Sequence, residues 1–123
     1  MDMDPVIWFE IYVQDMERAR AFYETVFQCE LNTLPSPGMT MLAFPSQMGR
    51  PGAAGSLVKM DGVASGGNST IVYFACEDCA VEAQRARAAG GKVEREKMSI
   101  GEYGFIALVV DTEGNMIGLH SMQ

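Results

Sequence analysis

Residues 6–27 read VIWFEIYVQDMERARAFYETVF, and residues 70–91 read TIVYFACEDCAVEAQRARAAGG. The two stretches lie 63 positions apart when Asp15 is aligned with Asp78. Each begins with a short run that alternates at a period of two, which favours a strand. Each then places an aspartate where it would cap a helix with apolar or small residues at helical spacing. A unit that recurs at a fixed distance predicts two copies of one supersecondary structure.

Further short strands are expected after each predicted helix. They are placed at about 30–34, 39–44 and 54–60 in the first half, and at about 92–98, 103–110 and 115–121 in the second. Gly90 and Gly91 end the second helix, whereas Gln28 stands where glycine would usually end the first. Residues 111–115, DTEGN, predict a tight turn with Gly114 at its positive-φ position. Each half therefore has the order βαβββ.

The expected fold is α+β, with the two tandem βαβββ modules forming a curled mixed sheet around a cavity. Residues 1–123 are expected to be a single domain, a length that suits one hydrophobic core. The first module covers about 5–60 and the second about 69–122, joined by a Gly- and Ser-rich linker over about 61–68.

Composition excludes several classes of partner. The net charge of −7 repels phosphate backbones, so nucleic acid is not expected as a partner. Apolar runs such as 105–110 are too short to span a bilayer, and the acidic start has no signal-peptide plan. The expected location is therefore the cytoplasm, with no membrane partner.

The three cysteines, Cys29, Cys76 and Cys79, are expected to be free thiols. Cys76 and Cys79 form a C-x-x-C spacing, but no second pair exists to complete a structural zinc site. A redox pair is one interpretation. The other is one thiol at the end of a strand and one at the start of a helix.

One face of the first strand is expected to look into the cavity. It carries Trp8, Glu10 and Tyr12, and the matching face of the second module carries Tyr73. An aromatic concave surface with a carboxylate is typical of a small-molecule site. The alternative is that these rings simply fill the interior, as large aromatic side chains often do.

The sequence resembles the vicinal oxygen chelate superfamily, which includes glyoxalase I, extradiol dioxygenases and bleomycin resistance proteins. The resemblance rests on three stretches: FEIYVQDMERARAFYETVF in the first half, and CAVEAQRARAAGGKV and DTEGNMIGLHS in the second. The resemblance covers essentially the whole chain and is nearest to the glyoxalase-like branch. It implies paired βαβββ modules, a site inside the curled sheet and, commonly, a homodimer.

The resemblance also implies where a metal would bind. In the metal enzymes of the superfamily, ligands come from the first and last strands of each module, and these positions map here to Trp8, Gly55, Ile71 and Gly118. Such side chains cannot ligate a divalent ion, and moving Gly55 by one position offers only Ser56. No metal and no cofactor is therefore expected. A different metal set, formed by Glu10, Glu102 and His120, is the alternative.

Two candidate catalytic residues remain, Glu10 and His120. Desolvation on the inner face would suit Glu10 to general-base chemistry, unless it pairs with Arg95 or lies at a wet mouth. His120 shares a strand face with Gly118 and could exchange a proton, or be an exposed bystander. Residues 99–105, SIGEYGF, read either as a flap that brings Glu102 and Tyr103 over the pocket or as an ordinary turn.

Three functions follow. The favoured one is binding of a small planar or apolar molecule without a metal, through Trp8, Glu10, Tyr12, Tyr73, Glu102, Tyr103, Gly118 and His120. Trp8 would stack on the ligand, or would only plug the space that a metal leaves. The second is a metal-free acid/base enzyme that uses Glu10, His120 or Tyr103. The third is a metal-dependent lyase or dioxygenase. Fold alone does not choose among them.

Overall fold

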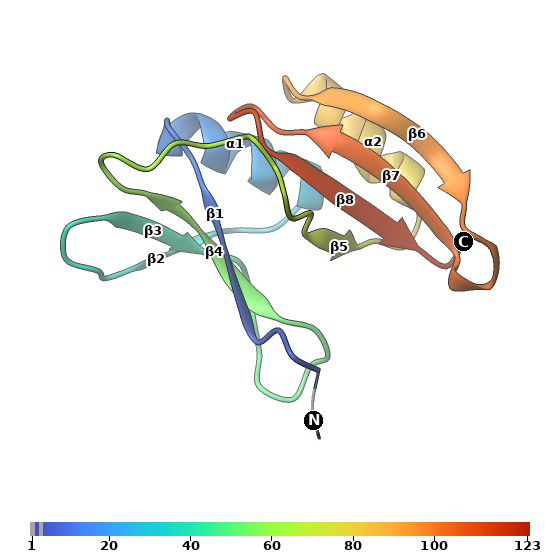
Figure 1. Ribbon diagram of the computed structural model, residues 1–123, viewed down its shortest axis with the longest axis horizontal. Helices are drawn as coiled ribbons and strands as arrows, with labels where there is room; N and C mark the ends of the chain where they lie inside the picture. The colour runs from blue at the N-terminus through green and yellow to red at the C-terminus, as the bar shows by residue number, and fades with distance from the viewer. Residues whose placement is uncertain (1, 3) are drawn as a thin grey trace.

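The computed structural model describes residue 2 and residues 4–123, and it contains both βαβββ units (Figure 1). The first module consists of β1 (Trp8–Tyr12), α1 (Met16–Phe27), β2 (Asn32–Leu34), β3 (Thr40–Ala43) and β4 (Ala54–Lys59). The second consists of β5 (Tyr73–Ala75), α2 (Cys79–Ala88), β6 (Lys92–Ser99), η1 (Gly101–Tyr103), β7 (Phe105–Val110) and β8 (Met116–Ser121). The expected α+β class and element order are confirmed.

Each module forms its own four-stranded mixed sheet. The strand orders are β1-β4-β3-β2 and β5-β8-β7-β6. The pairs β1–β4 and β5–β8 are parallel, and the remaining pairs are antiparallel. The chain thus has two equivalent mixed sheets, one in each module. The last hairpin differs from expectation, because Tyr103 lies in the 3-10 turn and β7 begins at Phe105.

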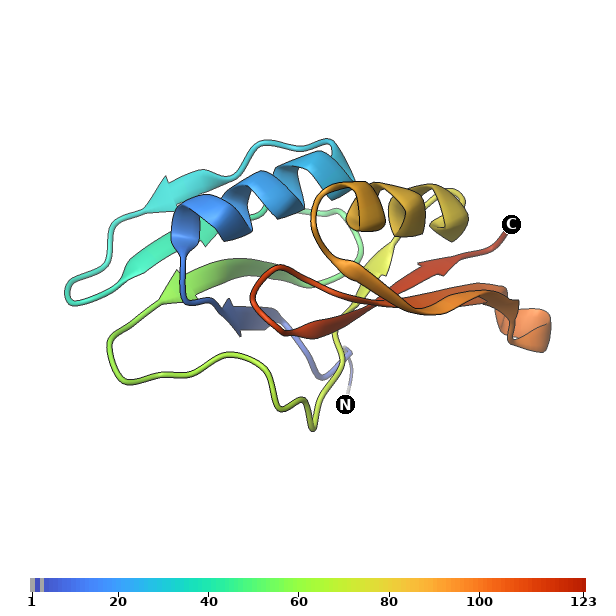
Figure 2. The ribbon, with the colours of Figure 1, turned by 90° about the horizontal axis from the view of Figure 1, so that it is seen from above.

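The two helices lie in one layer on the same side of both sheets, and their C-terminal ends meet (Figure 2). The side chain of Asp15 accepts the N–H of Arg18, and that of Asp78 accepts the N–H of Ala80, so both predicted caps are confirmed. Gln28 ends α1 in the left-handed region at φ 51°, a position that glycine occupies with less strain. The opposite face of the sheets carries no helix.

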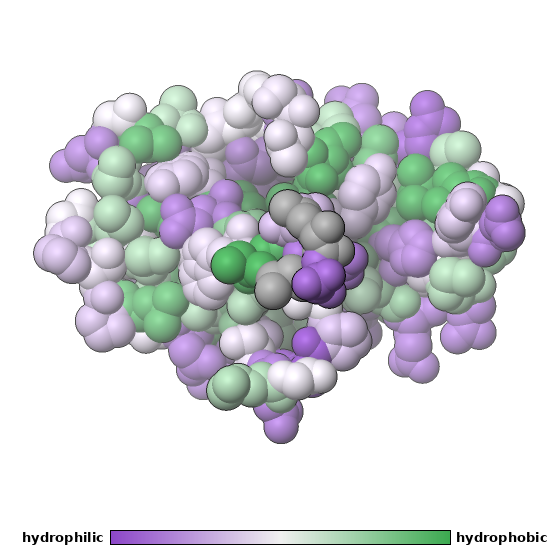
Figure 3. Space-filling model, turned by 60° about the horizontal axis from the view of Figure 1, so that its bottom comes forward, coloured by the Kyte–Doolittle hydropathy of each residue, from purple (hydrophilic) through white to green (hydrophobic). Residues whose placement is uncertain are grey.

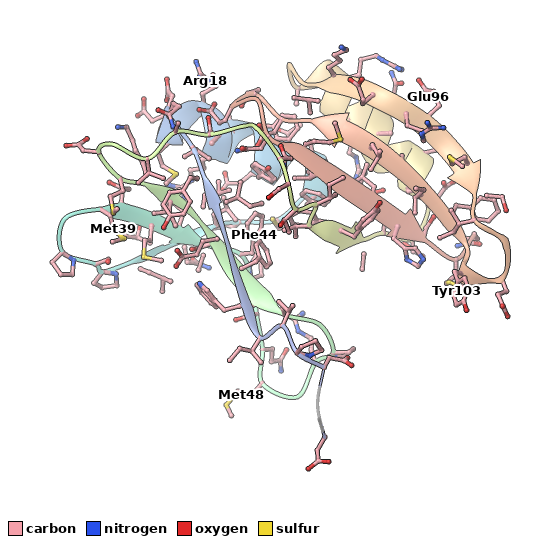
Figure 4. The ribbon with its side chains drawn as sticks, in the orientation of Figure 1. Arg18, Met39, Phe44, Met48, Glu96 and Tyr103 are labelled. Carbon is pink, nitrogen blue, oxygen red and sulfur yellow. The ribbon has the colours of Figure 1, made fainter. Side chains whose placement is uncertain are left out.

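An aromatic cluster joins the modules beneath the helices. The ring centroids of Phe9 and Phe74 are 5.8 Å apart, and those of Phe44 and Phe74 are 5.5 Å apart. Phe44 lies near the centre of the molecule, where the modules meet (Figure 4). Since Phe9 belongs to β1 and Phe74 to β5, these contacts place the first strands of the two modules beside each other.

The DTEGN turn, residues 111–115, links the second module to the first through hydrogen bonds. Asp111 accepts a 2.6 Å hydrogen bond from the Tyr23 hydroxyl, and Asn115 donates to the Tyr12 carbonyl at 2.8 Å. Glu113 accepts the backbone N–H groups of Gln14 and Asp15, each at 2.9 Å. Asp111, Glu113 and Asn115 are all buried. The turn is therefore a buried polar connection between the two modules.

Glu113 also forms an ion pair with Arg18, whose Nε lies 2.6 Å from Oε2. Burial raises the pKa of Glu113, but the hydrogen bonds from Arg18, Asp15, Gln14 and Thr112 outweigh it and lower the pKa to about 2. Arg18 extends from α1 at the edge of the molecule in Figure 4. The carboxylate is thus held in its charged form at neutral pH.

Candidate functional site

The face of the sheets opposite the helices carries the aromatic side chains that the sequence placed inside a cavity. Ile11 and Val13 are buried against the core, whereas Trp8 is 41% exposed and Tyr73 is 48% exposed. The alternation along β1 is therefore confirmed. Apolar groups on the view in Figure 3 are separated by polar ones and do not form one continuous band.

Trp8, Glu10 and Tyr12 form a connected group on β1. The Trp8 indole N–H donates to Glu10 Oε2 at 3.1 Å, and the Tyr12 hydroxyl donates to Glu10 Oε1, also at 3.1 Å. The hydrogen bond to Glu10 raises the pKa of Tyr12, with burial and the negative charge of Glu10 acting in the same direction. The carboxylate is thus oriented by two donors of its own strand.

This geometry corrects two expectations about Glu10. Its side chain is exposed, so the desolvation that would favour a general base is absent in the single chain. Arg95 forms no ion pair with Glu10 among the described residues, and its guanidinium donates to Met98 Sδ at 3.4 Å. The alternative that Glu10 lies at a wet position agrees with the structure.

A pocket of about 210 Å³ lies beside this group, where the two modules meet. Glu10 and Tyr12 line one side, the linker residues Ser65 and Asn68 another, and Met116 at the start of β8 a third. Asn68 holds the linker in place, because its side-chain amide bonds both the N–H and the carbonyl of Met116 at 2.9 Å. The linker is thus part of the wall of this pocket.

A second, shallow groove of about 480 Å³ lies on the β5–β8–β7 side of the face. Its lining consists of Tyr73, Ile100, Ile106 and His120. His120 sits opposite Ile106 in the β7–β8 register, and Tyr73 sits opposite Gly118 in the β5–β8 register. The structure therefore brings Tyr73, Gly118 and His120 together on the second sheet, whereas the Trp8 group belongs to the first sheet.

The segment with Glu102 and Tyr103 does not cover either site. Tyr103 is 69% exposed at the tip of the β6–β7 hairpin (Figure 4). Its backbone carbonyl, not its ring, reaches the site and lies 2.6 Å from His120 Nε2. Glu102 is exposed and makes no hydrogen bond or ion pair among the described residues. The flap interpretation is wrong for the arrangement observed, and the turn interpretation is correct.

The glycines at the expected ligand positions do not open a cavity. A Cβ on Gly118 would overlap the ring of Tyr73, and a Cβ on Gly55 would come within 2.5 Å of the Phe9 ring. Gly55 pairs with Phe9 and so faces the helices, whereas Ser56 pairs with Glu10 on the open face. Ser56 is therefore the counterpart of Gly118, and the register that assigned Gly55 was wrong by one residue.

The residues at these positions do not fit a divalent metal. The Trp8 indole can only donate, Ile71 and Gly118 offer no side-chain ligand, and a serine hydroxyl is a weak one. Ser56 is fully buried, and its hydroxyl has no hydrogen-bond partner among the described residues. Within residues 2 and 4–123, no three His, Cys, Asp or Glu side chains gather as a metal set, so Glu10, Glu102 and His120 do not form one.

Cys76 and Cys79 occupy strand-end and helix-start positions, as the structural interpretation of the C-x-x-C spacing expects. Burial, and after it the nearby Glu82 carboxylate, raises the pKa of the Cys76 thiol to about 12. Cys79 is fully buried, and its backbone N–H donates to Ser121 Oγ at 3.0 Å. All three cysteines are free.

Iodoacetamide at pH 8 is expected to alkylate Cys76 in the folded protein more than a hundredfold more slowly than in the urea-unfolded chain. A raised pKa leaves almost no thiolate, which is the reactive form. Peptide mass spectrometry over time would measure the rate. Rapid labelling, or a Cys76–Cys79 disulfide formed by a mild oxidant without unfolding, would contradict this account and favour the redox interpretation.

Comparison with known proteins supports the assignment of the fold. Residues 6–45 match the family model for the N-terminal part of bleomycin resistance protein-like proteins. Glyoxalase I from Zea mays has a TM-score of 0.73 at 22% identity over 94% of this chain and 45% of that chain. A glyoxalase/bleomycin resistance protein/dioxygenase family enzyme from Burkholderia phytofirmans has a TM-score of 0.69 at 16% identity, with 94% and 97% covered.

An antibiotic binding protein from a Streptomyces species has a TM-score of 0.67 at 25% identity, and the match covers 98% of each chain. Curated protein sequences include no match to this chain. The fold is thus that of glyoxalase/bleomycin resistance protein/dioxygenase family proteins, and residues 6–45 are similar to the N-terminal part of bleomycin resistance protein-like proteins. The chain spans about half the length of the maize glyoxalase I that it matches.

Three features of the site were missed by sequence reasoning. The linker wall with Ser65 and Asn68, and the pairing of Ser56 with Glu10, depend on strand register. The contribution of Ile100 and Ile106 to the groove had a usable signal, since alternation along residues 105–110 places Ile106 on the same face as His120 once the hairpin is closed.

No helix among the described residues is long and apolar enough to cross a bilayer.

Proposed function

We propose that the protein binds a small planar organic molecule on the open face of its sheets, without a divalent metal at the superfamily's ligand positions. The observation that most supports this proposal is that the rings of Trp8 and Tyr73 are half exposed on the face that the helices leave free. Large aromatic surfaces stack on planar ligands, and a few polar groups beside them fix orientation. Glu10 accepts the indole N–H of Trp8, and His120 lines the same groove as Tyr73.

The comparisons include a binding protein as well as enzymes, so the proposal of binding over catalysis also relies on the geometry of the site. The Streptomyces relative is described as antibiotic binding, and the matched family model is named for bleomycin resistance protein-like proteins. Glu10 and His120 lie on different sheets, and His120 bonds the carbonyl of Tyr103 rather than a second acid or base. These observations favour sequestration of a ligand, and the three free thiols agree with a cytoplasmic location.

The proposal includes a second copy of the chain. Val6 and Ile7, just before β1, are 62% and 73% exposed and adjoin the 41% exposed Trp8 in sequence, so this end of the chain offers apolar surface to a partner. Maize glyoxalase I, which matches this fold, is about twice as long as this chain. A homodimer would cover the open face with a second such unit, and sedimentation velocity of the wild-type protein and of I7E would detect it.

Ligand binding is expected to depend on Trp8. Titration with planar aromatic compounds should quench the fluorescence of this single tryptophan. By calorimetry, W8A should bind a responding compound about tenfold more weakly, because a stacked pair contributes roughly 1 kcal/mol beyond its buried area. W8F should retain most of the affinity.

M48A is the matched control, since Met48 is fully exposed on the loop before β4 (Figure 4). Equal affinities for W8A and wild type would refute the role of Trp8. Near-stoichiometric metal in untagged protein after incubation with Zn²⁺, Ni²⁺, Mn²⁺ or Fe²⁺ would refute the metal-free part of the proposal.

A further inference from the structure

The single histidine of the chain has a defined orientation in the groove formed with Tyr73, Ile100 and Ile106. His120 Nε2 lies 2.6 Å from the carbonyl oxygen of Tyr103. A carbonyl oxygen can only accept, so the proton of this hydrogen bond belongs to Nε2. In the neutral ring the lone pair is then on Nδ1, which has no hydrogen-bond partner among the described residues.

The Tyr103 carbonyl is held in place by a tight turn. The Gly104 N–H donates to the Gly101 carbonyl at 3.1 Å, and the Ile100 N–H donates to the Gly104 carbonyl at 2.8 Å. Gly101 and Gly104 both have positive φ, at 78° and 102°, a conformation that suits glycine. This turn is a fixed partner that selects one tautomer of His120, in the way that a second hydrogen bond sets which ring nitrogen is free.

The rest of the groove offers little to a polar ligand. Ile100 and Ile106 are apolar, and the ring of Tyr73 lies over Gly118. A ligand that enters this groove therefore meets two apolar side chains, the ring of Tyr73 with its hydroxyl group, and the free Nδ1 of His120. Since Nδ1 can only accept, it favours ligands that carry a matching donor, because an unpaired polar atom is costly to cover.

We infer that this groove binds flat, largely apolar molecules that carry a hydroxyl group, the phenol class, with the ligand O–H donating to His120 Nδ1. This inference rests on the proposed function and deepens it, because it names the class of ligand. Tyr73 and Ile106 contact the ring of the ligand, and the Tyr103 carbonyl keeps His120 in the tautomer that can accept. His120 is thus a specificity-determining residue that binds and does not react.

The first test is the tautomer of His120 in the wild-type protein. Nitrogen-15 NMR of the imidazole gives one pair of signals, because the chain contains one histidine. The neutral ring is expected to carry its proton on Nε2. Addition of p-cresol is expected to shift the Nδ1 signal and the methyl signals of Ile106. A proton on Nδ1 would overturn the inference.

The second test compares p-cresol with 4-methylanisole, which has the same ring but no hydroxyl proton. Wild-type protein is expected to bind p-cresol about tenfold more tightly, the discrimination typical of one hydrogen bond to a covered acceptor. H120Q keeps an amide donor at the position of Nε2 but has no acceptor at Nδ1, so it should lose this preference. H120N keeps a polar atom near Nδ1 and should retain part of it.

Equal affinities of the wild-type protein for the two probes, or an unchanged preference in H120Q, would overturn the inference. The absence of p-cresol binding would also overturn it. None of these results refutes the proposed function, which is tested separately through Trp8 and through compounds of any polarity. If H120Q does not fold, the tautomer measurement on wild-type protein still decides.

Discussion

Replacing Glu113 by glutamine is expected to lower the free energy of unfolding by about 3 kcal/mol at pH 7. The side chain of Glu113 is fully buried, and it accepts the backbone N–H groups of Gln14 and Asp15 together with the Arg18 guanidinium. Glutamine has one acceptor oxygen where the carboxylate has two, so it leaves donors of the first module unpaired. Urea denaturation followed by circular dichroism would measure the loss.

The contribution of Glu113 to the stability of the folded protein is also expected to depend on pH. Its pKa is lowered to about 2 in the folded protein, whereas an unfolded glutamate titrates near 4.3. Because the pKa of Glu113 is lower in the folded state, its ionisation stabilises the fold at any pH above the pKa of the unfolded state. This stabilisation is lost as the pH falls toward the pKa of the folded state. The difference in the free energy of unfolding between wild type and E113Q should therefore have its full value above about pH 5 and decrease progressively toward pH 2.

E30Q is the control for this experiment. Glu30 is exposed and makes no hydrogen bond or ion pair among the described residues. Its substitution should change stability by less than about 0.5 kcal/mol, as is usual at the surface. A difference between wild type and E113Q that stays constant from pH 7 to pH 2 would contradict the assigned ionisation of Glu113.

Replacing Gly55 by alanine is expected to destabilise the protein by about 3 kcal/mol, near the upper end of the usual cost of overpacking. The new methyl group would come within 2.5 Å of the Phe9 ring. Phe9 is itself held between Phe44 and Phe74, at centroid distances of 5.7 and 5.8 Å. Although Phe9 is only partly buried, these two contacts limit how far its ring can move, so the contact between the modules must adjust.

G118A is the matched comparison, since its methyl group would overlap Tyr73 in the same way. Tyr73 is 48% exposed, so its ring can move toward solvent at a cost of about 1 kcal/mol. Thermal and urea unfolding of both variants would compare them. An equal loss in the two variants would refute the argument that the packing around each ring decides its tolerance. In a protein that already carries Y73A, G118A should cause no further loss of stability, because the ring that its methyl group would overlap is gone.

The two modules could be predicted from local patterns. The alternation along residues 8–13, the capping positions of Asp15 and Asp78 and the turn at Gly114 each depend on residues close together in sequence. The assignment of Trp8, Glu10 and Tyr12 to one face was correct for the same reason, because strand side chains alternate. The position of Gly55 was wrong by one, because its face depends on pairing with β1 and not on its own neighbours.

The sequence by itself determined the order of elements and the resemblance, because residue type and short-range periodicity are sufficient for these. Only the tertiary structure decided what the polar residues do. Glu113 bonds Arg18 across 95 positions in sequence, and His120 is oriented by a carbonyl on another hairpin. Such contacts arise when separate strands and helices pack, so side-chain type alone cannot specify them.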